Sequence, residues 1–256
     1  MENNLLNKVG VVVLAAGKGT RLNCTDRPKV MLDLNGKPIV EYVVETLRQM
    51  GFADKQICLV VGFKHEIVEK YFGSSVVYAL QAEQLGTGHA VLMAEKIMKN
   101  KFENIVVIYG DSPFISQETI ESIIKNNIEN KNVVTMTSVV SPNYEAESAR
   151  FYDFGRVIRN ADNAIINITE KKDCTEQQLQ IKEGNAGYYC FEASWLWENL
   201  QKIKSNNVQN EYYLTDLVGL AISQNNKVES VVIPAEETFG INTLEQLGEA
   251  KKRLKG

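Results

Sequence analysis

Cysteine and histidine are scarce in this 256-residue sequence, and their spacing excludes the sites that depend on them. The four cysteines lie far apart, without a C-x-x-C pair, at Cys24, Cys58, Cys174 and Cys190. Because only two histidines are present, neither a zinc site nor a disulfide framework is predicted. Any bound metal ion is therefore expected to have oxygen ligands.

The sequence also lacks an excess of positive charge and a long hydrophobic run. Lys and Arg total 28 against 32 Asp and Glu, which gives a net charge of -4, so polymeric DNA or RNA is not expected as a partner. The apolar run Val9–Ala16 is far shorter than the roughly 20 residues of a membrane-spanning helix. Residues 1–8 lack the basic flank of a signal peptide. We expect a cytoplasmic chain with no membrane partner.

Strand-like and helix-like patterns alternate through the first half of the chain. Continuous apolar runs predict buried strands at Val9–Leu14, Ile57–Val61, Val76–Leu80 and Ile105–Tyr109. Between them, a helix with one apolar face is predicted from Pro38 to Gly51, and further helical patterns cover about residues 89–98 and 116–128. This alternation predicts an α/β fold, with a mostly parallel sheet flanked by helices.

The second half of the chain has a more mixed pattern. Strands are predicted at Val133–Val140, Arg156–Arg159, Ala164–Thr169, Tyr188–Phe191 and Val228–Ile233. Several of these are too close together for helical crossovers, so some pairs are expected to be antiparallel. We expect one α/β domain with a second, smaller β lobe.

A glycine loop, LAAGKGTRL at residues 14–22, follows the first predicted strand directly. It matches neither a Walker loop nor a dinucleotide fingerprint, because Leu22 stands where the third glycine of the fingerprint would be. Small residues let backbone N–H groups approach a polyphosphate, and Arg21 adds positive charge. A tight turn that needs glycine only for its backbone explains the loop equally well when the loop is taken alone.

The segment just downstream favours the phosphate interpretation. Arg27-Pro28-Lys29 places a second cation in a rigid stretch before the next helix. Together, the glycine loop and this segment resemble the signature of sugar-1-phosphate nucleotidyltransferases. The resemblance implies a Rossmann-like nucleotide-diphospho-sugar transferase fold and catalytic roles for Arg21 and Lys29. It also implies nucleotide contacts from Leu14, Ala15, Ala16 and Gly17.

A second block, QAEQLGTGHA at residues 81–90, follows the third predicted strand and opens a helix. A glycine-containing helix start can contact a nucleotide, and the amide of Gln81 suits the edge of a base. The block can also be only an entry turn with Thr87 as a cap. It resembles the uridine-reading segment of bacterial N-acetylglucosamine-1-phosphate uridylyltransferases, which implies nucleotide contacts from Gln81, Gly86 and Thr87.

Two oxygen-bearing side chains are candidates for a metal site. Asp111 follows the fourth predicted strand, and Asn242 precedes the last helix. Each has a structural explanation, as a loop cap or a helix N-cap. Mg²⁺ commonly takes one or two carboxylate or amide oxygens and fills its remaining positions with phosphates and water. The resemblance implies that Asp111 and Asn242 bind Mg²⁺.

Several short segments of the second half resemble those that hold the sugar phosphate in this family. The resemblance implies that Gly155 offers its backbone N–H, Glu170 accepts from sugar hydroxyls and Asn185 bonds a hydroxyl or the acetamido group. It further implies that Tyr213 packs against an acetyl methyl group and that Thr215 contacts the phosphate. Taken singly, each is typical of an ordinary surface or core residue, so their joint order along the chain carries the argument.

The departures from the family pattern concern the sugar side and the length. Ala186, Phe154 and Gly184 stand where the bifunctional enzymes usually have other residues, so the nucleotide is better indicated than the sugar. The sequence stops shortly after Leu254, without the hexapeptide-repeat acetyltransferase half of those enzymes. We therefore expect no acetyl transfer. The division expected is a nucleotide-binding half at about 1–112, a sugar-binding half at about 113–242 and a C-terminal helix at about 243–255.

The resemblance implies a UDP-N-acetylglucosamine pyrophosphorylase acting on UTP and N-acetylglucosamine 1-phosphate, both small molecules. The sugar phosphate would attack the α-phosphorus in line, so no His, Cys or Ser nucleophile is needed, and His65 and His89 are interpreted as structural. The alternatives are another sugar 1-phosphate with UTP or dTTP, a cytidylyltransferase acting on an alcohol phosphate, or a non-catalytic nucleotide sensor. A sensor is expected to have lost some of the four residues Arg21, Lys29, Asp111 and Asn242, yet all are present. The oligomeric state is not predicted.

Overall fold

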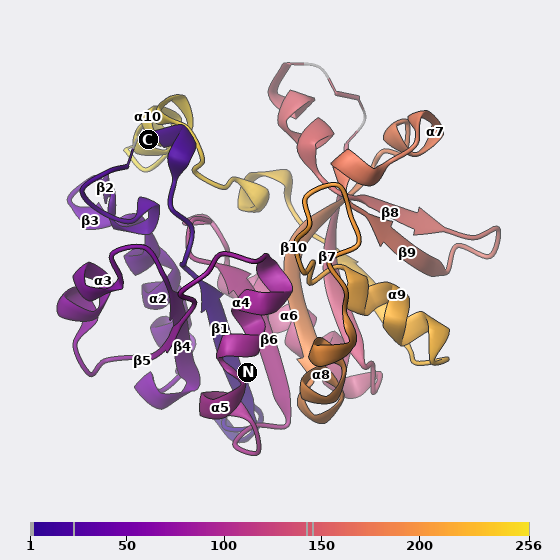
Figure 1. Cartoon of the computed structure of the whole chain (residues 1–256), viewed down its shortest axis with the longest axis horizontal. Helices are drawn as coiled ribbons and strands as arrows, with labels where there is room; N and C mark the ends of the chain where they lie inside the picture. The colour runs from indigo at the N-terminus through magenta and orange to yellow at the C-terminus, as the bar shows by residue number, and fades with distance from the viewer. Residues whose placement is uncertain (1–2, 23, 142, 145, 256) are drawn as a thin grey trace.

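A central sheet runs through the computed structural model, which describes residues 3–22, 24–141, 143–144 and 146–255. Among the described residues it has nine strands, of which seven lie in the order β11-β7-β10-β6-β1-β4-β5 (Figure 1). Their bounds are β1 Val9–Leu14, β4 Ile57–Val61, β5 Val77–Leu80, β6 Asn104–Tyr109, β7 Val134–Val140, β10 Glu183–Glu192 and β11 Val228–Val232. All neighbours pair in parallel except β10, which is antiparallel to both β6 and β7. The predicted mostly parallel α/β fold is confirmed.

Helices cover both faces of this sheet. One face packs against α2 (Ile39–Gln49), α3 (His65–Phe72) and α6 (Gln117–Glu129), and the other against α4 (Thr87–Met93), α5 (Glu95–Met98), α8 (Ala193–Asn199) and α9 (Asp216–Ser223). Successive strand residues point to opposite faces, so Val11 and Val13 join the first core while Val12 joins the second. This two-sided burial explains why the strands of the first half are continuously apolar.

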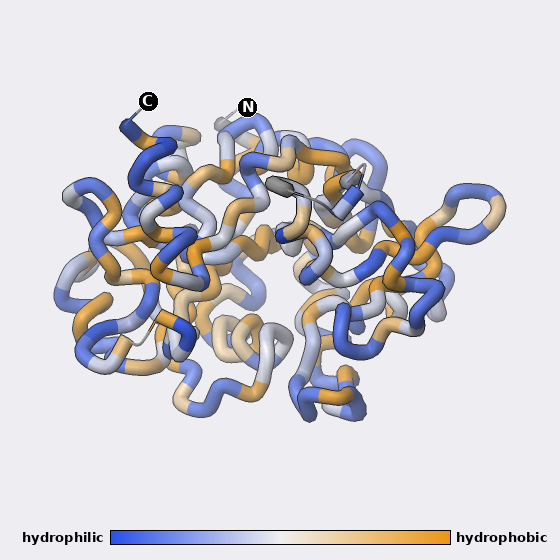
Figure 2. The backbone as a smooth tube through the Cα atoms, turned by 90° about the horizontal axis from the view of Figure 1, so that it is seen from above, coloured by the Kyte–Doolittle hydropathy of each residue, from blue (hydrophilic) through white to orange (hydrophobic). Residues whose placement is uncertain are grey.

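The second lobe is built on the two remaining strands of this sheet. β8 (Arg156–Arg159) pairs antiparallel with β9 (Ile165–Thr169), and β8 also meets β10 at Gly184. The short helix α7 (Glu176–Leu179) lies next to them (Figure 1). In Figure 2 the tip of this β8–β9 hairpin is hydrophilic, whereas the strands in the interior are largely hydrophobic.

The end of the chain returns to the first half. Helix α10 (Leu244–Arg253) lies beside the hairpin of β2 (Asp33–Leu34) and β3 (Lys37–Pro38) (Figure 1). Leu34, Phe239 and Ile241 form a small separate core under it. The remaining helix of the described chain, α1 (Asn3–Leu6), precedes β1. No helix among the described residues is long and apolar enough to cross a membrane.

Several predicted bounds are off by one residue, and two elements differ in a way that matters for the site. The helix predicted at about 89–98 begins at Thr87 and is divided into α4 and α5 at Ala94. The strand predicted at Tyr188–Phe191 begins earlier, at Glu183, and its pairing with β7 shifts register between Asn185 and Tyr189. Gly187 lies within this irregularity with a φ of 89°, a conformation that glycine adopts readily.

Candidate active site

The loops that carry the predicted residues meet at the carboxyl edge of the parallel strands. The glycine loop follows β1, the segment from Gln81 follows β5, and Asp111 follows β6. Gly62, which follows β4, lies between two of these loops: a Cβ atom at this position would be 2.8 Å from the oxygen of Ala16 and 3.0 Å from that of Gln81. Open α/β sheets bind their ligands at this edge.

Three adjoining cavities open at this edge, and Tyr109 lines all of them. The first cavity, of about 280 Å³, is called the nucleotide cavity after the contacts predicted for its residues, and it is lined by Leu14, Ala15, Ala16, Gly17, Lys29, Gln81, Gly86 and Thr87. The central cavity, of about 370 Å³, is lined by Arg21, Asp111, Gly155, Glu170, Asn185 and Asn242. The side chamber, of about 200 Å³, is lined by Glu170, Tyr213 and Thr215, among others. Every predicted site residue therefore lies in one connected region.

Lys29, Asp111 and Asn242 meet where the nucleotide and central cavities adjoin. The ammonium of Lys29 donates to the carboxylate of Asp111 and to Oδ1 of Asn242, the latter at 2.9 Å. The side chains of Lys29 and Asp111 are only 13% and 16% exposed. Asn242 is not the cap of α10, because the hydroxyl of Thr243 accepts from the N–H of Gln246. Its side chain is therefore available to the cavity.

These oxygens satisfy the donor chemistry of a hard divalent cation. A carboxylate and a carboxamide oxygen already converge on one positive charge, the ammonium of Lys29. The described residues contain no cluster of three or more His, Cys, Asp or Glu side chains that could hold a metal ion. A Mg²⁺ ion bound here would thus have Asp111 and Asn242 as protein ligands and would take further oxygens from phosphates and water.

Arg21, near the end of the glycine loop, lines the central cavity. It lies in the 3-10 turn Thr20–Leu22 and is exposed. Within the described part of the chain no ion pair or hydrogen bond of its side chain is recorded. Its guanidinium is thus free to take a planar two-pronged contact with a phosphate.

Gln81 lines the nucleotide cavity with part of its amide already engaged. The side chain is 3% exposed, and Nε2 donates to the oxygen of Gly86 at 3.1 Å and lies 3.1 Å from Nδ1 of His89. These contacts engage the amide nitrogen rather than the carbonyl oxygen of Gln81. His89 lines none of the three cavities. Gly86 adopts a φ of 112°, and a Cβ there would lie 2.6 Å from the oxygen of Tyr212, so this turn requires glycine.

The predicted sugar-side residues are linked by hydrogen bonds. Thr215 Oγ1 donates to Glu170 Oε1 at 3.0 Å, and the backbone N–H of Asn185 donates to the oxygen of Gly155 at 2.8 Å. Burial raises the pKa of Glu170, and the bond from Thr215 lowers it by a smaller amount. The hydroxyl of Thr87, at the start of α4, accepts from the N–H of Leu214 at 3.0 Å and so connects α4 to this region.

Two tyrosines of the site were not predicted from the sequence. Tyr109 lines all three cavities, and its place at the end of β6, two residues before Asp111, is a signal that could have found it. Tyr189 lines the side chamber from within β10. Its position in an apolar strand is typical of a core residue, so the sequence holds no comparable signal for it.

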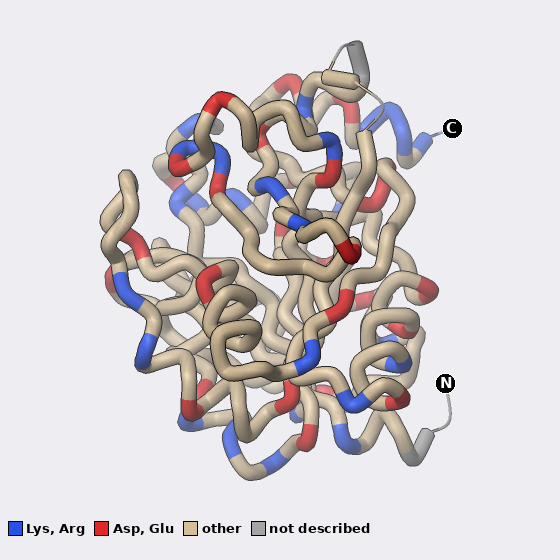
Figure 3. Tube along the Cα trace, turned by 90° about the vertical axis from the view of Figure 1, so that its right-hand side faces the viewer, with Lys and Arg blue, Asp and Glu red and all other residues tan. Residues whose placement is uncertain are grey.

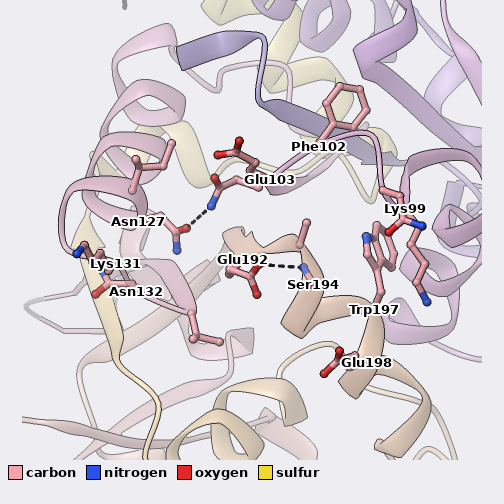
Figure 4. A pocket seen from close by; sticks show the side chains of 15 residues that line it. Lys99, Phe102, Glu103, Asn127, Lys131, Asn132, Glu192, Ser194, Trp197 and Glu198 are labelled. Atoms are coloured by element: carbon pink, nitrogen blue, oxygen red, sulfur yellow. Dashed lines mark hydrogen bonds between the residues drawn. The ribbon is translucent and has the colours of Figure 1, made fainter. Parts of the chain in front are cut away.

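A larger cavity of about 640 Å³ lies at the opposite edge of the sheet (Figure 4). Asn104 begins β6 there, Glu192 ends β10, and the labelled side chains of Asn127 and Trp197 face the same space. None of the predicted site residues lines it. In the view of Figure 3 acidic and basic residues are interspersed along the chain.

The fold is an open α/β sheet with three adjoining cavities at the carboxyl edge of its parallel strands. Residues 11–153 match the model of the MobA-like NTP transferase domain, and the chain belongs to this family. The fold is also that of a solved structure titled UDP-glucose pyrophosphorylase complexed with UDP-glucose. That match has a TM-score of 0.77 and 19% identity, over 97% of this chain and 98% of the other.

Relatives of similar sequence confirm the resemblance to N-acetylglucosamine-1-phosphate uridylyltransferases. The chain is 41% identical over 245 residues to the bifunctional protein GlmU of Clostridium beijerinckii, a match that covers 95% of this chain and 51% of that protein. It is 37% identical over 245 residues to the GlmU of Acetivibrio thermocellus, with the same coverage of 95% and 51%. The chain thus spans about half the length of these relatives.

Proposed function

We propose that this protein is a UDP-N-acetylglucosamine pyrophosphorylase, which makes UDP-N-acetylglucosamine and pyrophosphate from UTP and N-acetylglucosamine 1-phosphate. The convergence of Lys29, Asp111 and Asn242 at the boundary of the nucleotide and central cavities carries this proposal. It puts cationic and metal-binding groups at the place where two phosphate-bearing substrates must meet. The GlmU relatives support the choice of substrates.

The reaction needs positioning and charge neutralisation rather than a protein nucleophile. A phosphate oxygen of the sugar 1-phosphate attacks the α-phosphorus of UTP, the bond from that phosphorus to the β-phosphate oxygen breaks, and pyrophosphate leaves. The attacking group is already ionised, so no general base is required. Arg21 and Lys29 offset the repulsion between the two anions and the charge that moves to the leaving group. Mg²⁺ held by Asp111 and Asn242 would add a further counter-charge.

The nucleotide cavity favours uracil over cytosine in this proposal. With Nε2 of Gln81 engaged by Gly86 and His89, the carbonyl of Gln81 faces the base as an acceptor. Uracil presents an N3–H donor, whereas N3 of cytosine is an acceptor. A wrong base would leave an unpaired polar group, which costs about 1–3 kcal/mol.

The proposal includes the division predicted from the sequence, with nucleotide binding in residues 1–112 and sugar binding mainly in 113–242. It also includes the cytoplasm as the place of action and the absence of a nucleic-acid partner. Glucose 1-phosphate is the second candidate substrate. The side chamber next to Glu170 favours the larger acetamido sugar, because a glucose hydroxyl would leave much of its volume of about 200 Å³ unfilled.

The test is a pyrophosphate-release assay with Mg²⁺, in which UTP, dTTP and CTP are paired with N-acetylglucosamine 1-phosphate and glucose 1-phosphate. We expect UTP with N-acetylglucosamine 1-phosphate to have the highest kcat/KM and CTP to be at least about tenfold slower. No release with any pair would contradict the enzyme assignment and favour a nucleotide sensor. Equal kcat/KM for UTP and CTP would contradict the assigned role of Gln81.

A further inference from the structure

The side chamber adjoins the central cavity through Glu170, which lines both. The remaining walls of this chamber come from distant parts of the chain and include Thr87, Tyr189 and Thr215. Thr87 and Tyr109 also line the nucleotide cavity. With a sugar phosphate in the central cavity, a substituent of the sugar can extend past Glu170 into this chamber. The polar groups of the chamber should therefore determine which substituent of the sugar can bind there.

Two of these polar groups are already paired within the protein. Thr215 Oγ1 donates to Glu170 Oε1 at 3.0 Å, and Thr87 Oγ1 accepts from the N–H of Leu214 at 3.0 Å. Glu170 keeps its other carboxylate oxygen: a Cβ atom at Gly155 would lie 3.4 Å from Oε2. The chamber therefore offers an acceptor at Glu170, next to the central cavity.

The hydroxyl of Tyr189 differs from these groups because it has no hydrogen-bond partner of normal geometry among the described residues. The residue is 1% exposed, and its buried hydroxyl makes no hydrogen bond to any described residue. Burial raises the pKa of Tyr189 well above its usual value, so the phenol stays protonated and remains a donor. Its ring is held in a stack with Phe191, with centroids 5.5 Å apart and an interplanar angle of 23°.

An unpaired donor of this kind has a free-energy cost. Leaving a buried donor or acceptor unsatisfied costs about 1–3 kcal/mol, and nearly all buried polar groups in native proteins are paired. The carboxamide of Asn185 lies near enough to lower the pKa of Tyr189, but it makes no hydrogen bond of normal geometry to the hydroxyl. An acceptor on a bound ligand would remove this cost.

We propose that Tyr189 determines specificity for the sugar, its hydroxyl donating to the carbonyl oxygen of an acylamino substituent on the sugar 1-phosphate. This inference rests on the proposed function and names a residue that reads the substituent. An acylamino group has an N–H donor and a carbonyl acceptor separated by one carbon, so it can pair with Glu170 and with Tyr189 together. A hydroxyl at the same ring carbon is a single atom and leaves Tyr189 unpaired.

The test compares wild type with Tyr189→Phe, which removes one oxygen atom. kcat/KM is measured for N-acetylglucosamine 1-phosphate and for glucose 1-phosphate, at saturating UTP and Mg²⁺. We expect the preference for the acetamido sugar to fall about tenfold in Tyr189→Phe, entirely through slower reaction of that sugar. The KM for UTP should not change.

Tyr188→Phe is the matched control, because the two tyrosines are adjacent on β10 and face opposite sides of the sheet. The hydroxyl of Tyr188 donates to the oxygen of Glu237 at 2.7 Å, so its removal should lower the melting temperature and leave the sugar preference unchanged. In the absence of substrate, the melting temperature of Tyr189→Phe should equal or exceed that of wild type, because the variant lacks the unpaired buried hydroxyl.

The outcomes separate this inference from the proposed function. An unchanged sugar preference in an active Tyr189→Phe variant would overturn the inference and leave the function intact. A marked loss of stability in Tyr189→Phe would also overturn it, because the hydroxyl would then have a partner in the free protein. A wild-type protein that turns over neither sugar phosphate would overturn the proposed function and the inference with it.

Discussion

The ammonium of Lys29 lies against the carboxylate of Asp111, and the two residues are 82 positions apart in the sequence. The same ammonium donates to Asn242 Oδ1 at 2.9 Å. A lysine and a divalent ion that use the same oxygens must compete for them. Occupancy by Mg²⁺ would thus release Lys29 toward the nucleotide cavity, which it also lines.

Lys29→Met is expected to bind Mg²⁺ more tightly than wild type in the absence of substrates. Removing one positive charge in contact with Asp111 should raise the affinity for Mg²⁺ about tenfold. This change in binding free energy is smaller than the full interaction energy of two charges in contact. Calorimetric titration with Mg²⁺ measures the change. Lys18→Met is the control, because Lys18 is exposed on the glycine loop and lines neither the nucleotide cavity nor the central cavity. An unchanged affinity in Lys29→Met would show that the ammonium does not compete with the metal.

Arg21→Ala should lower turnover more than it lowers UTP affinity. A charge that stabilises the leaving group acts on the transition state, and by analogy with the loss of one preorganised donor we expect kcat to fall about 10²–10³-fold. Arg21→Lys should retain only part of the wild-type kcat, because a point charge cannot form the two-pronged contact with phosphate. Arg27→Ala, which breaks only the surface pair with Asp26, is the control. A normal kcat with a raised KM for UTP would instead assign Arg21 to binding alone.

Asp111→Ala and Asn242→Ala should each abolish turnover while the fold persists, because their side chains bond Lys29 in the cavity rather than the core. Thr243→Ala is the opposite case. It removes the cap of α10 and should cost about 1 kcal/mol of stability with activity kept. Thermal melts and pyrophosphate release on all three variants make the comparison. Unfolding of Asp111→Ala or Asn242→Ala would assign that residue a structural role.

The KM for the sugar phosphate should rise as the pH is lowered. The rise should begin at a higher pH than it would if Glu170 were an exposed glutamate with an ordinary pKa. Burial raises the pKa of Glu170, and only its ionised form accepts hydrogen bonds with both oxygens. Protonation on the acid side therefore removes an acceptor. In Glu170→Gln the side chain does not titrate, so the rise should be absent. The phosphate of the substrate ionises identically with both proteins, so a pH profile shared by both would contradict this role.

The loop residues of the site could be predicted because they directly follow recognisable strands. Parallel strands bring their carboxyl ends to one edge, so the glycine loop, Gln81 and Asp111 were placed together by the order of elements alone. Asn242 required the family resemblance, since a polar residue before a helix is usually its cap. In the structure the adjacent Thr243 is the cap instead.

The wall of the side chamber could not be predicted in the same way. Tyr189 lies in β10, where aromatic residues are typical of the core, and only the unpaired hydroxyl distinguishes it. The start of β10 was also missed, because Gly184 and Asn185 are unfavourable in strands. Pairing of these residues with β7 outweighs that local preference.

Transfer of an ¹⁸O label tests the central claim most directly. N-acetylglucosamine 1-phosphate labelled in its three non-bridging phosphate oxygens is incubated with UTP, Mg²⁺ and the protein. The ¹⁸O content of each product is then measured by mass spectrometry. If the sugar phosphate attacks the α-phosphorus of UTP, all three labelled oxygens should appear in UDP-N-acetylglucosamine and none in pyrophosphate. Label in pyrophosphate, or UTP consumed without a labelled UDP-sugar, would contradict the account.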